Sequence, residues 1–305
     1  MKLWRVLGKE KPINSVTKQE KRHREDLERL KRFRPIDDTF MRGLFKDNVP
    51  LAELVLRIIT GKPDLVLLKC ETQADMKRVT GARSICLDAY ATDSMGKKYD
   101  LEVQRADHGA DPHRARYHSS MMDVENLDEK QDYRELPDTY VIFITERDYY
   151  RAGEAVYVIE NMNLTLGKPF DDGAHILYVN GEYRDDSAIG RLMHDFNCTN
   201  AEDMHYKLLA EKTRYLKENP KGVSEMCKVM EELREESFAE GREEGRAEGR
   251  KEGRAEGRKE GRGEQARMTA IRMSKKGLSI EEIADAVDFS VEIVKKWLAS
   301  EKLGK

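Results

Sequence analysis

Three polar side chains stand at positions where together they could bind a divalent cation. Asp88 lies in an alternating stretch that predicts a strand over residues 84–93, and Glu102 and Gln104 lie in a second one over residues 97–104. Because the side chains of a strand point alternately to its two faces, Glu102 and Gln104 share one face. Carboxylate oxygens suit a hard cation such as Mg²⁺ or Mn²⁺. A cation held there could activate water for hydrolysis of a phosphodiester bond.

The turn between the two predicted strands decides whether the acidic residues meet. A three-residue loop, Ser94-Met95-Gly96, with its glycine in the left-handed conformation, pairs Asp93 with Lys97 and so puts Asp88 opposite Glu102. Directly opposed carboxylates repel each other unless a cation lies between them. Two other outcomes stay open from the residues alone. The pair could belong to an ordinary polar face of the hairpin, or a one-residue shift in register could separate it.

The elements that would hold this hairpin form a mixed α/β pattern. The apolar spacing predicts two helices before it, the second ending at Gly61, and then a buried strand over residues 65–70. After the hairpin it predicts a helix over residues 111–127 and a central strand over residues 140–144. The order is therefore helix, three strands, helix, strand. Two short strands and further helices extend it, at residues 155–159, 175–179 and 188–215.

Several segments in combination resemble a known family. They are Leu87-Asp88, Glu102-Val103-Gln104, Asp37-Asp38-Thr39-Phe40, Phe45-Lys46, Arg114-Ala115-Arg116-Tyr117 and Leu136-Pro137-Asp138-Thr139-Tyr140-Val141-Ile142-Phe143-Ile144. Over about residues 34–235 the chain resembles the PD-(D/E)XK nuclease superfamily, and within it the Rpn branch of recombination-promoting nucleases, also described as transposases. The resemblance implies an α/β fold with a restriction-endonuclease-like αβββαβ core and a mixed central sheet.

The resemblance also implies roles for the hairpin residues. Asp88 and Glu102 would be metal ligands, and Gln104 stands where the superfamily has a lysine, a replacement that is common in this branch. A glutamine can orient water or phosphate but carries no charge. If a cationic side chain is needed, Lys46, Lys98 or Arg114 would supply it.

Other residues receive roles from the resemblance and have an ordinary alternative. Asp38 would be an acidic helper in catalysis, or else only a favourable charge at a helix N-terminus. Arg114 and Tyr117, one helical turn apart, would contact DNA phosphates, or else be ordinary surface and core residues. His108, His113 and His118 form a sequence cluster without a zinc-ligand pattern, and Pro63-Asp64 is interpreted as a turn.

Composition and charge indicate which cellular compartment the protein is expected to occupy. The net charge of the 305 residues is −3, and 37% of them are charged. The N-terminus lacks a long apolar run, no window approaches 18 apolar residues, and the four cysteines show no CxxC or Cys/His metal spacing. We therefore expect a cytoplasmic protein with no membrane span. Residues 1–34 carry 12 Lys/Arg against 5 Asp/Glu, which favours either a phosphate-attracting arm or a solvated terminus.

The last third of the chain has a different character. A Glu-Gly-Arg-Xaa repeat places glycines at positions 241, 245, 249, 253, 257 and 261. Each glycine costs about 1 kcal/mol in a helix interior, so the segment is either disordered or packed closely against a partner helix. We favour the packed alternative and expect a homo-oligomer. Beyond it, two short helices, starting after Ser279 and Ser290, predict a helix-turn-helix element.

These patterns predict four regions and one function. The regions are a basic N-terminal arm (1–34), a nuclease-like domain (35–230), a repeat helix or linker (231–264) and a helix-turn-helix-like segment (265–305). The function is a Mg²⁺-dependent endonuclease that cuts DNA in recombination or mobile-element movement. The alternatives are a catalytically inactive DNA-binding protein and a helical assembly protein, each retaining a nuclease-like scaffold.

Overall fold

The computed structural model describes residues 18–76, 85–105 and 107–303. The chain divides into two compact units, Met1–Leu233 and Arg234–Lys305. In the described part of the chain, no helix combines the length and the apolar character that crossing a lipid bilayer requires.

A six-stranded mixed sheet forms the centre of the first unit. Its order is β1-β2-β3-β4-β8-β5. The first three strands are antiparallel, β3, β4 and β8 run parallel, and β5 is antiparallel to β8. The mixed sheet expected from the sequence is therefore present. The strands are β1 (Leu67–Met76), β2 (Ile85–Asp93), β3 (Lys98–Gln104), β4 (Thr139–Thr145), β5 (Val156–Ile159) and β8 (Ala174–Asn180).

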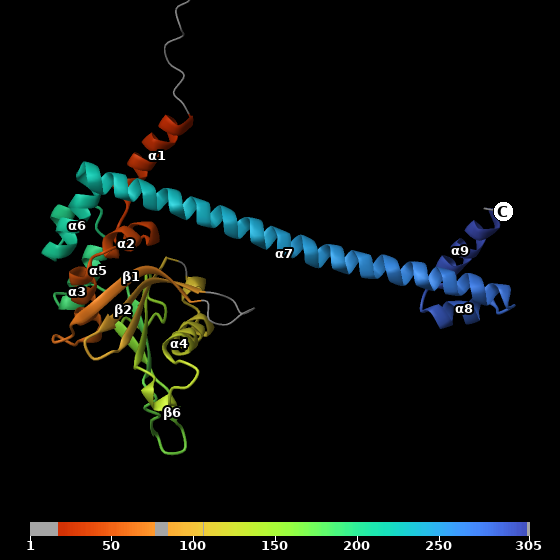
Figure 1. Cartoon of the computed structure of the whole chain (residues 1–305), viewed down its shortest axis with the longest axis horizontal. Coiled ribbons are helices and arrows are strands. Elements are labelled where there is room, and N and C mark those ends of the chain that lie inside the picture. The colour runs from red at the N-terminus through yellow and green to blue at the C-terminus, as the bar shows by residue number, and fades with distance from the viewer. Residues whose placement is uncertain (1–17, 77–84, 106, 304–305) are drawn as a thin grey trace, which may run out of the picture. The chain divides into compact units, whose positions relative to one another are not determined.

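Helices cover both faces of this sheet (Figure 1). One face packs against α2 (Asp38–Phe45) and α3 (Val49–Thr60), with α5 (Ala188–Phe196) and α6 (Lys207–Glu218) adding to the same buried cluster. The other face packs against α4 (Pro112–Asn126). The apolar side chains of β3 point to the α2 and α3 side, which leaves its polar side chains facing α4. The active-site hypothesis therefore depends on which side chains of α4 lie against the polar side chains of β3.

The helix ends follow local sequence signals. α3 starts after Asn48, whose side chain accepts a hydrogen bond from the Leu51 N–H, and ends at Gly61 with a φ of 66°. A left-handed residue at this position is the usual glycine stop, as predicted. α4 starts after Asp111, whose carboxylate accepts from the His113 N–H at 2.8 Å.

A helix that the sequence analysis did not predict precedes the sheet. α1 (Lys18–Arg32) lies within the region interpreted as a basic arm, and its Leu30 is buried. The ammonium group of Lys217 on α6 donates hydrogen bonds to the carbonyls of Lys31 and Phe33, at 3.2 and 2.6 Å, where α1 ends. Because these carbonyls have no partner inside α1, Lys217 caps the helix and connects it to α6 within the first unit.

Short elements complete the first unit. They are η1 (Asp107–Ala110), η2 (Tyr133–Glu135), η3 (Ala201–Asp203) and a two-stranded hairpin of β6 (Met162–Asn163) and β7 (Lys168–Pro169). Leu164 and Leu166 in the hairpin turn are exposed.

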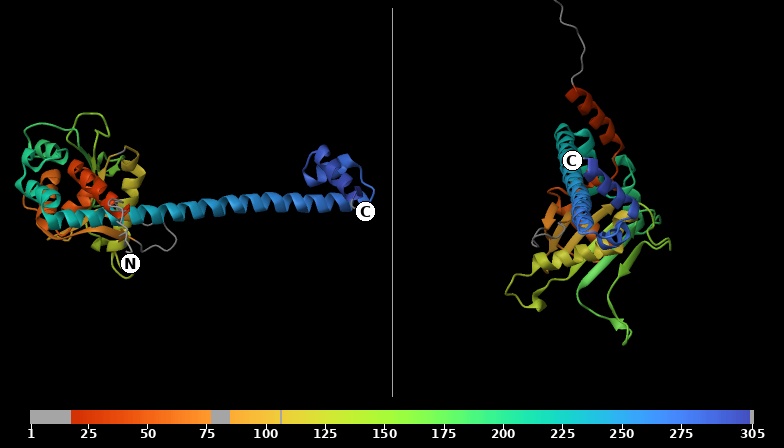
Figure 2. Two further views of the ribbon diagram at one scale, coloured as in Figure 1. Left: turned by 90° about the horizontal axis from the view of Figure 1, so that it is seen from above. Right: turned by 90° about the vertical axis from the view of Figure 1, so that its right-hand side faces the viewer.

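The second unit begins inside α7 (Pro220–Lys275), which Figure 2 shows as one uninterrupted helix. The repeat glycines lie within α7, and a Cβ atom built on any of them would meet nothing within 4 Å. α8 (Ile280–Val287) and α9 (Val291–Leu303) follow, and Ala270, Ile283 and Val294 form the centre of a small buried cluster with them. DNA binding by α8 and α9 stays a prediction.

Candidate active site

The β2–β3 hairpin has the turn and register that the sequence predicted. The N–H of Gly96 donates to the Asp93 carbonyl at 3.1 Å, and the N–H of Asp93 donates to the Lys97 carbonyl at 3.1 Å. Gly96 has a φ of 84°, the left-handed conformation that this loop requires. Ala89 pairs with Leu101, so Asp88 and Glu102 come next on the two strands.

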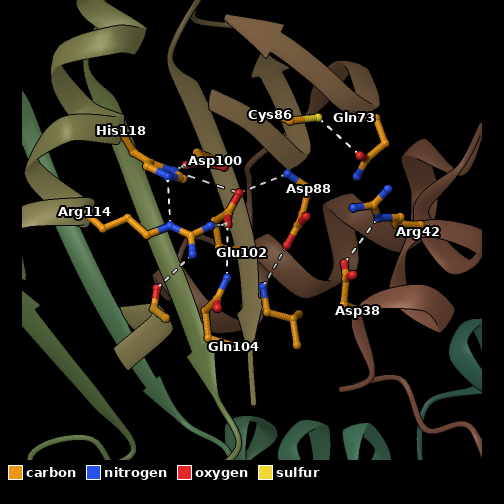
Figure 3. Close-up of polar contacts among 12 residues, drawn as sticks. Asp38, Arg42, Gln73, Cys86, Asp88, Asp100, Glu102, Gln104, Arg114 and His118 are labelled. Atoms are coloured by element: carbon orange, nitrogen blue, oxygen red, sulfur yellow. Dashed lines mark hydrogen bonds and ion pairs between the residues drawn. The ribbon is translucent and has the colours of Figure 1, made fainter. Parts of the chain in front are cut away.

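The backbone pairing between β2 and β3 ends at Ala89 and Leu101. Beyond this pair, side-chain carboxylates accept the hydrogen bonds of backbone N–H groups in place of carbonyl oxygens. The N–H of Asp88 donates to Oε1 of Glu102 at 3.0 Å, and the N–H of Val103 donates to Oδ2 of Asp88 at 3.4 Å. Each acidic side chain thus accepts a hydrogen bond from the backbone of the opposite strand (Figure 3). A shifted register would not give these contacts, so that alternative is wrong.

Both carboxylates are buried. Asp88 is 8% exposed and Glu102 is 0% exposed, which excludes an ordinary solvated face of the hairpin. Burial raises the pKa of Asp88 well above its usual range, and the nearby charges of Glu102 and Asp38 raise it further. Burial also raises the pKa of Glu102 to about 7, with a second contribution from Asp100. Such pKa values indicate negative charge that lacks enough compensating positive charge.

Arg114 and Gln104 reach Glu102 from two directions. Nη2 of Arg114 lies 3.1 Å from Oε2 of Glu102, and Nε2 of Gln104 lies 3.4 Å from the same oxygen. Arg114 comes from the first turns of α4 and also donates to the Gly109 carbonyl at 3.2 Å. Its side chain is 41% exposed, whereas that of Glu102 is fully buried. Arg114 therefore joins the buried carboxylate to the surface.

Two buried residues that the sequence analysis did not assign to the site lie behind Glu102. Nδ1 of His118 lies 2.8 Å from Oδ2 of Asp100, and Nε of Arg114 donates to Nε2 of His118 at 3.2 Å. Because Nε2 accepts, Nδ1 carries the proton and donates it to Asp100. Burial lowers the pKa of His118, in agreement with a neutral ring. Asp100 could have been found, since it shares the period-two face of Glu102, whereas the sequence marked His118 only as part of a histidine cluster without a zinc-ligand pattern.

The first helix contributes one acidic and one basic residue. Asp38, the first residue of α2, lies 3.3 Å from Nε of Arg42, and the charges of both act on Asp88. Arg42 was missed from the sequence. Lys46, one of the three candidate cations, is exposed directly after α2, and among the described residues it makes no hydrogen bond or ion pair with Asp88 or Glu102. Positive charge near Asp88 comes from Arg42 instead.

The remaining candidates fall elsewhere. Tyr117 is partly buried against the apolar cluster beneath α4. His113 is exposed beside Asp111, while His118 is buried, so these two do not share a site; the side chain of His108 lies outside the described residues. Asp64 is exposed in the turn after α3, as predicted.

The donor set fits a hard divalent cation. The carboxylates of Asp100 and Glu102 offer ligand atoms within 4.8 Å of each other and of a ring nitrogen of His118, and all three residues are buried, with both nitrogens of His118 already hydrogen-bonded. Oδ1 of Asp100 is buried without a hydrogen-bond partner among the described residues. A buried carboxylate oxygen with no partner is costly, and a cation would relieve that cost. Asp88, linked to Glu102 through the strand backbone, adds a further carboxylate.

A mixed sheet flanked by helices, with buried carboxylates where β2 and β3 diverge, is consistent with a PD-(D/E)XK fold. The family model described as PD-(D/E)XK nuclease family transposase matches residues 50–184, so this part of the chain is similar to that family. The match includes the whole hairpin and α4. No curated protein and no solved structure matches the chain significantly.

Proposed function

We propose that the protein is a metal-dependent DNA endonuclease that acts in recombination or mobile-element movement. One observation carries the proposal: Asp88 and Glu102 are buried at the point where β2 and β3 diverge, their pKa values are raised, and each accepts a hydrogen bond from a backbone N–H of the opposite strand. Buried acidic residues of this kind are unfavourable for stability, and a catalytic metal site accounts for them. The family match to nuclease-type transposases supports the same function.

Asp88 and Glu102 would hold the cation, Mg²⁺ or Mn²⁺, with Asp100 available nearby. When bound, such a cation lowers the pKa of a water molecule and stabilises negative charge on a phosphodiester. Gln104, which donates to Glu102, would fix the carboxylate and orient water or phosphate through its amide. It supplies no charge, so positive charge must come from Arg114 or Arg42.

Arg114 has the geometry to contact DNA. Its Nη2 holds Glu102 and its side chain is 41% exposed, so the second N–H of Nη1 and of Nη2 can meet a phosphate oxygen. His118 and the Gly109 carbonyl fix its other nitrogens, at 3.2 Å each. In this proposal Arg114 positions the scissile phosphate beside the carboxylates. The roles that the sequence predicted for Asp38, Lys46 and Tyr117 stay predictions.

Plasmid cleavage by the full-length chain tests the proposal. With Mg²⁺ the wild type should nick or cut DNA, and Asp88→Asn or Glu102→Gln should lower the rate about a hundredfold or more, because each removes charge from the metal site. Asp64→Asn, an exposed aspartate before β1, is the control and should keep the wild-type rate. Cleavage that survives both substitutions would mean that the site is elsewhere.

The uncharged Gln104 favours one alternative, a DNA-binding protein without catalysis. The same preparation separates the two. A wild type that binds DNA, shows no cleavage with Mg²⁺ or Mn²⁺, and gains none with raised metal concentration would support the inactive alternative. DNA binding that is lost on removal of residues 265–305, with cleavage already absent, would assign that binding to the second unit.

A further inference from the structure

A second group of metal-binding side chains lies at the end of α5, away from the carboxylates of the hairpin. His194 is in the last turn of α5, Cys198 follows four residues later, and His205 lies just before α6. The rings of His194 and His205 have centroids 4.7 Å apart and are tilted by 54°. Tilted rings at this separation can direct one nitrogen each toward a common point.

The distances suit a tetrahedral ion. Sγ of Cys198 lies 3.5 Å from Nδ1 and 3.9 Å from Nε2 of His194, and His194, Asp195 and Cys198 offer ligand atoms within 4.8 Å of one another. With Zn–S bonds of about 2.3 Å and Zn–N bonds of about 2.0–2.1 Å, neighbouring ligand atoms are separated by roughly 3.3–3.6 Å. His205 is not part of this group of close ligand atoms, so its ring, whose centroid lies 4.7 Å from that of His194, would have to rotate to bring a nitrogen to the ion.

Asp195 contacts both the end of α5 and the segment before α6, and so fixes the positions of the two histidines. It is 0% exposed, and its carboxylate accepts hydrogen bonds from the N–H groups of His205 and Tyr206, both at 2.8 Å. The same carboxylate lies 3.1 Å from Nδ1 of His194. A ligand histidine commonly donates one ring N–H to a carboxylate, which leaves the other nitrogen for the metal. Asp195 would therefore orient His194 with Nε2 free.

We propose that His194, Cys198 and His205 bind a zinc ion, with Asp195 orienting His194 and with water completing the coordination. Imidazole and thiolate donors select a borderline or soft ion such as Zn²⁺ rather than Mg²⁺, so this site and the carboxylate site would take different metals. The site would join the end of α5 to the start of α6, which both pack on the core.

Charges around the sulfur support binding of a cation. Asp195 and Asp203 lie near Cys198, and Arg184 is the one opposing charge among the described neighbours that act on the thiol. Zinc binding would form one Zn–S bond and release one proton from sulfur to solvent.

The sequence analysis found no Cys/His metal spacing, and this site explains why. The ligands follow the spacing His-x₃-Cys-x₆-His, with a single cysteine and without the paired motif that is usually recognised. The residues meet because the chain turns back after α5 and because Asp195 fixes the returning segment. The distance of 3.5 Å between Sγ of Cys198 and Nδ1 of His194 also suits a hydrogen bond from the thiol to the ring. A metal-binding measurement distinguishes the two arrangements.

Cobalt titration of the metal-free full-length protein tests the proposal. We expect one Co²⁺ per chain with a thiolate-to-cobalt charge-transfer band, and displacement of that band by one equivalent of Zn²⁺ but not by excess Mg²⁺. Cys198→Ser should abolish the band, and His205→Gln, at an exposed position, should weaken the affinity at least tenfold. Cys227→Ser is the matched cysteine control and should behave as the wild type.

The readout is independent of nuclease activity. Asp88→Asn, which alters the carboxylate site, should leave the thiolate band unchanged, so failure of one proposal does not affect the other. Far-ultraviolet circular dichroism checks that each variant is folded. A wild type without a thiolate band, or a band that persists in Cys198→Ser, would overturn the zinc site and leave a thiol–imidazole hydrogen bond as the explanation of the cluster.

Discussion

Glu102 illustrates how a single buried residue can oppose stability. It is fully buried, its partners are one arginine, one amide and one backbone N–H, and its neighbours Asp88 and Asp100 are also acidic. Burial raises the pKa of Glu102 to about 7, so the folded protein binds this proton more tightly than the unfolded chain does. In the absence of metal, the charged form of Glu102 therefore lowers the free energy of unfolding.

We expect Glu102→Gln to stabilise the metal-free protein above neutral pH. A carboxylate with a raised pKa gives stability that is fully present below the unfolded value, 4.5, and is lost as the pH rises toward the folded value of about 7. The glutamine variant does not titrate, so in chelator at pH 8 its midpoint of unfolding should exceed that of the wild type. Near pH 4 the difference should disappear. Denaturation with urea at both pH values measures it.

The exposed carboxylate variant Glu129→Gln is the control and should show no such difference. Addition of Mg²⁺ at pH 8 should stabilise the wild type and not Glu102→Gln, because only the folded wild type binds the ion. If the metal-free wild type is the more stable protein at pH 8, the carboxylate is adequately compensated and the argument from burial fails.

The sequence predicted the carboxylates that the strand pattern and the loop length determine. Asp88 and Glu102 follow from a three-residue loop and a period of two, which are both local properties. Arg42 and His118 could not be predicted in the same way. Their positions depend on how α2 and α4 pack across the sheet, and that packing arises from contacts between segments far apart in the sequence.

The β2–β3 hairpin is the element that fixes the register of the site, and Asp93 holds its turn. Oδ1 of Asp93 accepts from the N–H groups of Met95 and Lys97, both at 2.9 Å, and Oδ2 accepts from the hydroxyl of Tyr99 at 2.9 Å. Asp93 is 4% exposed. The sequence analysis paired Asp93 with Lys97 across the loop, and these contacts explain why a loop of this shape needs an aspartate there.

We expect Asp93→Ala to destabilise the protein by about 1–3 kcal/mol, since it leaves buried hydrogen-bond donors without an acceptor. The looser turn should also weaken Mg²⁺ binding by the wild-type carboxylates, although Asp93 does not contact them. Urea denaturation and calorimetric titration measure the two effects. Ser94→Ala, at an exposed position of the same loop, should change stability by less than about 0.5 kcal/mol. Equal effects of both substitutions would show that Asp93 has no special role.

Other elements show where sequence patterns are weak. The predicted strand at residues 65–70 extends in the structure to β1 (Leu67–Met76), whose second half is polar. β1 is an edge strand of the sheet, so these side chains need not be apolar. α1 was missed because its sequence is dominated by charge, and its position depends on Lys217, about 190 residues away in the chain. By contrast, β4 is fully buried, and its continuous run of apolar residues predicted a central strand.

At the level of the whole molecule, the regularly spaced glycines of α7 need a structural explanation. Six of them recur every fourth residue, and in the single chain a Cβ at any of these positions would meet no atom within 4 Å. A period of four drifts by about 40° per repeat around the helix, so the glycines form a slowly winding stripe. Each costs about 1 kcal/mol relative to alanine. The sequence prediction that a second copy of the chain packs on this stripe stays an inference that needs a test.

Replacing Gly249, Gly253 and Gly257 together by alanine tests this inference. Without a partner, the three methyl groups meet only solvent and each should stabilise α7 by about 1 kcal/mol, with no change in molecular mass. With a partner helix close to the stripe, the methyl groups force the helices apart, since the interaxial distance follows the size of the side chains at the contact. We therefore expect the substitution to lower the oligomer mass in light scattering. Lys251→Ala, beside the stripe, should leave that mass unchanged, and a monomeric wild type would exclude assembly through α7.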